Sequence, residues 1–210
     1  MSAAKAMTPS FNLHKKFPAL ARIGAMAEYF PQYQNQDPAP HWHDEIVEML
    51  YILTGQGEHL IGGTSFPLRP GSLGIVHYGQ AHAILTEAPG LELVNIYIDP
   101  FSYGVPALPS AFLQVLPRIL PLHRSLQHEQ NLVLHLSFSP PEKTSFLIQA
   151  FASESREQTA GALQAARLYF QLFLIECARQ LLSDEARPIE TGPAPAGGVV
   201  EELRRYLDKN

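Results

Sequence analysis

A chain of 210 residues with 46% hydrophobic and 17% charged side chains has a globular composition, and it is long enough for one large domain, or for one domain plus a fragment. Its net charge of −5 argues against nucleic-acid binding by this chain, because binding to phosphate groups needs clustered Lys and Arg. The single cysteine, Cys177, excludes an internal disulfide framework and a Cys-rich zinc site, and it fits a reducing, cytoplasmic setting. No stretch has the apolar character of a membrane span, and the N-terminus lacks the long apolar run of a signal peptide.

The first half of the chain has the pattern of short strands broken by turns. After a loose lead-in over residues 1–19, the predicted strands cover residues 22–30, 46–53, 58–61, 65–68, 72–76, 82–86 and 91–98, with a Pro-rich loop over 31–40. Gly62-Gly63 predicts a hairpin turn, and Pro70-Gly71 predicts another turn. Turn signals at intervals of about 8–12 residues, with no helix between them, predict an antiparallel barrel or sandwich.

Helices are expected near the C-terminus. Residues 101–131 predict loops and a short helix, and residues 132–138 predict a further strand. Ser139-Pro140-Pro141-Glu142 has the spacing of a capping box, with Ser139 accepting a bond from the free amides of a helix that runs to about Ser155. A second, longer helix is predicted from about Thr159 to Leu182, which gives an antiparallel helix pair.

The longer helix is apolar on nearly all of its faces. Its main apolar stripe is spaced almost as a heptad seam and consists of Leu163, Ala166, Phe170, Phe173, Cys177 and Leu181. The stripe can pack on the strands of the same chain. Because Leu168, Leu172, Leu174 and Ile175 crowd the other faces, the helix needs a second partner, and we expect the stripe to form the interface of a homodimer.

The last residues predict the start of another domain. Residues 188–198 have the composition of a linker, and residues 199–209 form an amphipathic helix with nothing after it to pack on. We therefore divide the chain into residues 1–138 (the strands and their lead-in), 139–186 (the helical dimerisation segment), 187–198 (the linker) and 199–210 (the first helix of a truncated domain).

A cluster of histidines is the strongest chemical signal. His41 and His43 lie two residues apart, so on a strand their side chains converge on one face. Glu48 has the opposite parity to His43, so a bend between them is needed to bring the carboxylate to the same side. His82 opens a later strand and is the natural fourth member.

These four residues suit a divalent transition metal such as Zn, Ni, Fe or Mn, since imidazole and carboxylate together give a mixed nitrogen and oxygen ligand set. Without a metal, the same residues would hydrogen-bond a polar ligand directly. We expect His59 and His77 to be peripheral. Tyr51 and Tyr97 are candidates either for ligand contact or for packing outside the site, because a register error of one residue exchanges the two faces of a strand.

The spacing resembles the first motif of the cupin family, in which a His-x-His pair is followed by Glu after four residues and by Gly after six more. Here these places are taken by His41, His43, Glu48 and Gly55, while Pro70-Gly71 and His82 resemble the second motif. Residues 48–84, the later strand and the two helices are also similar to the sensor domain of AraC-type transcription regulators. The final helix is similar to the start of that family's helix-turn-helix domain.

The resemblance implies a cupin fold, a double-stranded β-helix or jelly-roll barrel followed by an antiparallel helix pair. It also implies a domain that senses a small-molecule effector and dimerises, with DNA bound only through the absent C-terminal domain. Such a sensor would not be an enzyme. Two alternatives stay open: a small cupin metalloenzyme, such as a dioxygenase or isomerase, and a non-catalytic metabolite-binding cupin.

Overall fold

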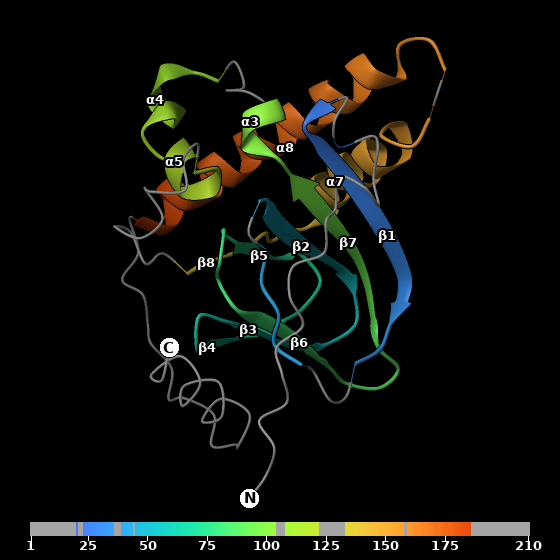
Figure 1. Cartoon of the computed structure of the whole chain (residues 1–210), viewed down its shortest axis with the longest axis vertical. Coiled ribbons are helices and arrows are strands. Elements are labelled where there is room, and N and C mark those ends of the chain that lie inside the picture. Colours follow the sequence, from blue (N-terminus) through green and yellow to red (C-terminus); the bar gives the residue numbers. More distant parts are fainter. Residues whose placement is uncertain are drawn as a thin grey trace, which may run out of the picture.

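The structure, a computed structural model, describes residues 20, 23–35, 39–43, 45–103, 108–121, 133–157 and 159–185 of the chain (Figure 1). The strands among these residues are β1 (Ala25–Tyr33), β2 (Val47–Thr54), β3 (Gly57–Ile61), β4 (Thr64–Leu68), β5 (Ser72–Val76), β6 (His82–Thr86), β7 (Leu91–Ile98) and β8 (Leu134–Ser137). The short helices are α3 (Pro100–Tyr103), α4 (Ser110–Leu113) and α5 (Leu116–Ile119), and the long ones are α7 (Glu142–Glu154) and α8 (Ala162–Glu185).

The strands form two antiparallel sheets, one of five strands in the order β1-β7-β2-β5-β8 and one of three strands in the order β4-β3-β6. Buried side chains from both sheets meet between them, with Leu50 and Leu93 from the first and Leu68 and Ile84 from the second. The predicted mainly β fold with C-terminal helices is confirmed. Among the described residues it is built as two facing sheets in place of one closed ring of strands.

The predicted limits of β5, β6 and β7 are confirmed, whereas the loop predicted from residue 31 is wrong for its first three residues. β1 continues through Tyr33, which pairs with Leu91 after an irregularity in the register. Pro31 is tolerated there because β1 is the edge strand of its sheet, where a residue without an N–H group need not complete a ladder.

The long helices cover one face of the five-stranded sheet (Figure 1). Alternate residues of β2, among them Val47, Met49 and Tyr51, point into the apolar core shared with α7 and α8. The residues between them, Leu50 and Ile52, point toward the three-stranded sheet. The two faces of β2 therefore have different partners, and Glu48 has the parity of the face toward the three-stranded sheet.

The start of α7 corrects the predicted capping box. Pro141 is the residue that caps the helix, and no side chain makes a capping bond there. Ser139 lies three residues before Glu142, the first residue of the helix, which is too far upstream for its hydroxyl to occupy the cap position. The carbonyl of Pro141 instead accepts bonds from the amide of Ser145 at 2.8 Å and the hydroxyl of Thr144 at 2.9 Å.

The apolar stripe of α8 packs inside the single chain, which corrects its assignment to a dimer seam. Five of its members are buried (Ala166, Phe170, Phe173, Cys177 and Leu181), and Leu163 is partly buried against the same core. The ring of Phe170 stacks on Phe151 of α7 with centroids 4.9 Å apart and meets Tyr103 edge-on at 5.1 Å. The five buried members expose at most 4% of their surface, so they cannot form an interface with a second chain while α8 stays packed on its own sheet.

Several expectations lie outside the described residues: the lead-in over residues 1–19, the linker over residues 187–198 and the helix over residues 199–210. Among the described helices, none combines the length and the apolar character that crossing a membrane requires.

Candidate metal centre

The four predicted ligand residues meet at one end of the space between the two sheets. His41 and His43 precede β2, Glu48 lies in β2, and His82 is the first residue of β6. One candidate ligand atom from each lies within 4.8 Å of the others. His41 is held beside His82 by two backbone bonds, one in each direction, of 3.0 and 2.8 Å. The cluster therefore joins the five-stranded sheet to the three-stranded one.

The bend predicted between His43 and Glu48 is present. The chain bends at Glu45, β2 begins only at Val47, and the carbonyl of His43 accepts a bond from the amide of Gly79 at 2.8 Å. The imidazole rings of His41 and His43 accordingly converge, with centroids 5.2 Å apart.

Gly55, the last residue of the predicted motif, closes the turn after β2 with φ at +93°. A Cβ atom there would lie 2.4 Å from the carbonyl oxygen of Gly90. Both its backbone conformation and its close approach to the neighbouring turn therefore require glycine.

Glu48 is the charged centre of the cluster. Its Oε2 lies 2.5 Å from Nε2 of His43 and 3.6 Å from Nε2 of His82. Burial alone would raise the pKa of Glu48, but the facing imidazoles of His82 and His43 outweigh it and lower the pKa to about 2. The carboxylate is therefore ionised at neutral pH.

The imidazoles are suited to the role of metal ligands. Burial lowers the pKa of His82 well below 6.5 and also lowers that of His41, in both cases against the opposing effect of Glu48. Nε2 of His82 is buried and has no hydrogen-bond partner among the described residues. The neutral imidazoles of His41 and His82, an ionised carboxylate and an unpartnered ring nitrogen fit a divalent transition metal.

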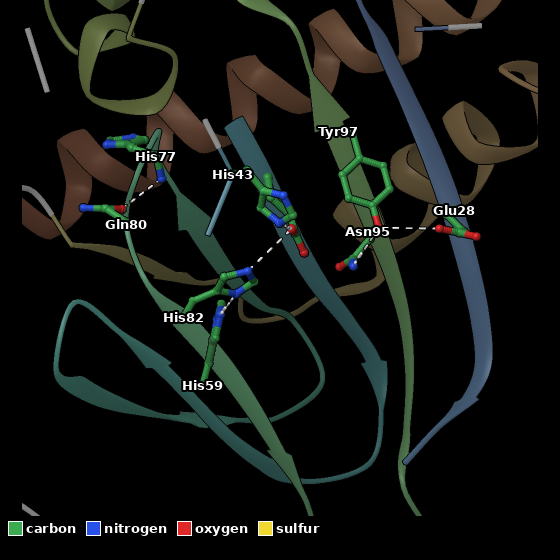
Figure 2. Close-up of polar contacts among 9 residues, drawn as sticks. Glu28, His43, His59, His77, Gln80, His82, Asn95 and Tyr97 are labelled. Carbon is green, nitrogen blue, oxygen red and sulfur yellow. Dashed lines mark hydrogen bonds and ion pairs between the residues drawn. The ribbon is translucent and has the colours of Figure 1, made fainter. Parts of the chain in front are cut away.

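A polar group that the sequence analysis missed lies beside the cluster (Figure 2). Nδ2 of Asn95 lies 3.3 Å from the hydroxyl of Tyr97 and donates to it, and this hydroxyl donates to Oε2 of Glu28 at 3.5 Å. Tyr97 is the cross-strand partner of Glu48, and Asn95 is the partner of Leu50. Oδ1 of Asn95 is buried and has no hydrogen-bond partner among the described residues. The structure thus places the predicted ligand candidate Tyr97 next to the cluster.

Asn95 could have been found from its position in the sequence. β7 is otherwise apolar at its centre, and Asn95 has the parity of Tyr97. A buried amide in such a row needs a partner, which is itself a sign of a site.

Tyr51 does not belong to the site. It lies on the helix-facing side of β2, where its hydroxyl is 2.7 Å from Oγ1 of Thr144 and 3.0 Å from Oγ of Ser145. The parity of Glu48 in the same strand already excludes it from the opposite face, so the assignment of Tyr51 to ligand binding is corrected.

The two histidines expected to be peripheral differ from each other. His59 is fully buried, and its Nε2 lies 3.1 Å from Nδ1 of His82, so the expectation is wrong for His59 (Figure 2). His77 stands apart from the cluster, and its backbone amide donates to the side-chain oxygen of Gln80 at 2.8 Å. It is not among the clustered candidate ligands.

Comparison with solved structures finds cupin proteins and AraC-like regulators. The chain is similar to a predicted oxalate decarboxylase from Thermotoga maritima, with 25% identity, a TM-score of 0.30 and coverage of 32% of this chain and 60% of that one. It is similar to ToxT from Vibrio cholerae at 9% identity, with 89% and 65% coverage and a TM-score of 0.46. The AraC-like transcriptional activator CuxR matches at 9% identity, with 80% and 51% coverage and a TM-score of 0.42. The chain thus spans less than two thirds of the length of each of these proteins. No curated protein matches the chain.

A family described as the AraC-like ligand binding domain matches residues 24–131. The matched stretch is just over half of the chain, and it contains β1 to β7 together with the four clustered ligand candidates. The chain therefore belongs to the AraC-like ligand-binding domain family.

Proposed function

We propose that this chain is the effector-sensing domain of a cytoplasmic transcription regulator and that a small molecule binds at the cluster between the two sheets. The observation that carries the proposal is the convergence of His41, His43, Glu48 and His82, whose candidate ligand atoms lie within 4.8 Å of one another. These residues would hold a divalent Zn, Ni, Fe or Mn ion, which would orient an oxygen or nitrogen atom of the effector. DNA would be contacted by another domain of the regulator.

The effector would also contact the polar group on β7. Oδ1 of Asn95 is a buried acceptor beside the cluster, and Tyr97 fixes the amide by accepting from its Nδ2. An effector with an N–H or O–H group near its metal-binding atom would satisfy that acceptor. Since an unpaired buried acceptor costs about 1–3 kcal/mol, this contact would add selectivity.

The metal is tested by elemental analysis of protein purified without a nickel resin. We expect about one equivalent of a divalent metal, or uptake of one equivalent when zinc, nickel, iron or manganese is added to chelator-treated protein. Metal well below one equivalent after this addition would contradict the metal site. A replacement of His77 by Gln is the matched control, because that buried histidine is outside the cluster and its loss should leave the stoichiometry unchanged.

A second candidate function is that of a small metalloenzyme, a dioxygenase or isomerase. Three imidazoles and one carboxylate leave coordination positions open on a six-coordinate metal, which is what substrate activation requires. The two functions differ in what happens to a bound metabolite. A metal-loaded sensor releases the metabolite unchanged, as would a non-catalytic metabolite-binding cupin. An enzyme converts the metabolite to product. Mass spectrometry of the metabolite after long incubation distinguishes these outcomes.

Sensing would be coupled to dimerisation, and we place the contact on the exposed side of α7 and α8. Phe146, Leu168 and Leu172 are 60%, 61% and 47% exposed, and Phe146 meets Tyr169 of α8 edge-on. In a two-fold symmetric dimer, an exposed apolar patch of this kind is buried against the same patch of the second copy. Light scattering should report a dimer for the wild type and a folded monomer for Leu168→Glu/Leu172→Glu. A dimer that survives both changes would contradict this placement.

A further inference from the structure

The side of His82 that faces away from Glu48 is occupied by a second histidine. His59 lies in β3 with no accessible surface, and its Nε2 is 3.1 Å from Nδ1 of His82 (Figure 2). Nε2 of His82 is the nitrogen that faces Glu48 and the other candidate ligands, at 3.6 Å from the carboxylate. The His82 ring is therefore held at Nδ1 by His59, while its Nε2 faces Glu48 without a hydrogen bond among the described residues.

The ring of His59 fits against a strand residue that has no side chain. A Cβ atom at Gly74 of β5 would lie 2.3 Å from Nδ1 and 2.6 Å from Cε1 of His59. Gly74 is not among the glycines with a positive φ, so its backbone conformation does not itself require glycine. The missing side chain at Gly74 is what leaves space for the ring of His59.

The hydrogen bond between the two rings has a chemical consequence. A neutral imidazole carries one proton, so His82 can present a lone pair at Nε2 only if its proton sits on Nδ1 and finds an acceptor there. Without a metal, the carboxylate of Glu48 favours a proton on Nε2 of His82, and Nδ1 must then receive a bond. His59 has no accessible surface, and a neutral imidazole carries one donor and one acceptor, so its Nε2 can meet Nδ1 of His82 in either role.

We propose that His59 is the positioning residue of the metal centre. It can hydrogen-bond Nδ1 of His82 in either tautomer, and this leaves Nε2 of His82 able to coordinate a metal. The proposal rests on the metal-binding function proposed above. When the site is loaded, the proton on Nε2 of His82 leaves to solvent and the proton on Nε2 of His59 passes to Nδ1 of His82. To stay neutral, His59 then takes up one proton at its own Nδ1, which is buried and has no hydrogen-bond partner among the described residues, so this proton can enter only when the site opens transiently. The two rings remain neutral, and no net proton is released by the pair.

The first test reads the tautomers directly. In protein labelled with ¹⁵N histidine, the ring-nitrogen signals of the metal-free protein should show His82 protonated at Nε2 and donation from His59. One equivalent of zinc should move the proton of His82 to Nδ1 and that of His59 to its own Nδ1. His59 signals that stay unchanged while zinc binds would overturn the proposal.

The second test measures zinc affinity by competition with a chelator. His59→Leu should weaken zinc binding by about 10–100-fold, because Nδ1–H of His82 then has no acceptor. His59→Gln should recover most of the affinity, since a side-chain amide can present either its oxygen or its nitrogen. Gly74→Ala should weaken binding as His59→Leu does while keeping His59, because the added Cβ displaces its ring.

His77→Leu is the matched control, a buried histidine outside the cluster, and it should bind zinc like the wild type. The far-ultraviolet circular dichroism and thermal midpoint of each variant establish that it is folded. Should His59→Leu not fold, His59→Gln and Gly74→Ala still give the comparison. Wild-type protein that binds no zinc contradicts the metal site itself, whereas equal affinities of the wild type, His59→Leu and Gly74→Ala overturn only the role of His59.

Discussion

The two faces of the five-stranded sheet use alternate residues of the same strands for different purposes. On the face toward α7 and α8, Met49 and Tyr51 of β2 lie in a continuous apolar core. On the face toward the three-stranded sheet, Glu48 of β2 and Asn95 and Tyr97 of β7 interrupt the apolar row with polar groups. Neighbouring residues of one strand thus belong either to the apolar core or to the site. Substitutions on the helix-facing side should therefore change stability, and those on the site face should change metal binding.

The largest effect on stability is expected on the helix-facing side. Phe173 is fully buried between Phe138, Phe170 and Tyr51. Phe173→Ala leaves a cavity that its rigid neighbours cannot fill and should lower the free energy of unfolding by about 3–5 kcal/mol. Urea denaturation measures this. Gln164→Ala, at an exposed position of the same helix outside the proposed dimer contact, is the control and should change it by about 0.5 kcal/mol or less. Similar losses for both variants would contradict the assignment of Phe173 to the core.

The next effect is expected on the site face and should concern binding. Glu48→Gln removes the only charged carboxylate among the four clustered candidate ligands but keeps the shape of the side chain. Loss of a residue that only hydrogen-bonds to a metal ligand lowers metal affinity by up to roughly 100-fold. Because Glu48 would be a ligand itself, zinc affinity should fall by more than this. Isothermal titration calorimetry measures this change. The control, Glu58→Gln in β3, should bind zinc normally, and a Glu48→Gln variant that does so as well would remove Glu48 from the ligand set.

The sequence predicts the site better than its surroundings because the motif is local. His41, His43 and Glu48 are a few residues apart, so strand geometry and one bend bring them together. Placing Tyr97 beside Glu48 requires the register of β7 against β2, which spacing along the chain does not determine. The position of His59 likewise depends on the pairing of β3 with β6.

The stripe of α8 shows a different limit. Its helical period identifies an apolar face correctly. The period does not determine whether that face packs on the same chain or on a second copy. The structure places Phe170 and Phe173 against the same chain, so the apolar residues left uncovered, such as Leu168, become the candidates for a second copy. Only the three-dimensional packing distinguishes the two cases.

A smaller effect concerns pH. His77 is buried, and burial lowers its pKa to about 4, against a hydrogen bond to the backbone of Arg118. The unfolded chain, with an ordinary value near 6.5, binds more protons between about pH 4 and 6.5, so the native state loses stability as the pH falls through this window. Relative to the wild type, His77→Gln should flatten the decline in unfolding free energy from pH 6.5 to 5 by at most about 1.4 kcal/mol per pH unit. Equal slopes in urea titrations at several pH values would show that His77 is not buried as a neutral ring.

The smallest effect tests whether Tyr51 belongs to the helix-facing side. Its hydroxyl lies within hydrogen-bond distance of Thr144 and Ser145 and donates to the carbonyl of Pro141 at 3.2 Å. Tyr51→Phe should lower the free energy of unfolding by about 1 kcal/mol, because Thr144 keeps its own bond to Pro141 and no buried donor is orphaned. Zinc affinity should not change, because the ring points away from Glu48. Tyr29→Phe, which removes an exposed hydroxyl bonded to Glu92, is the matched control and should be nearly neutral. Reduced zinc binding in Tyr51→Phe with unchanged stability would place Tyr51 on the site face and reverse the division between the two faces of β2.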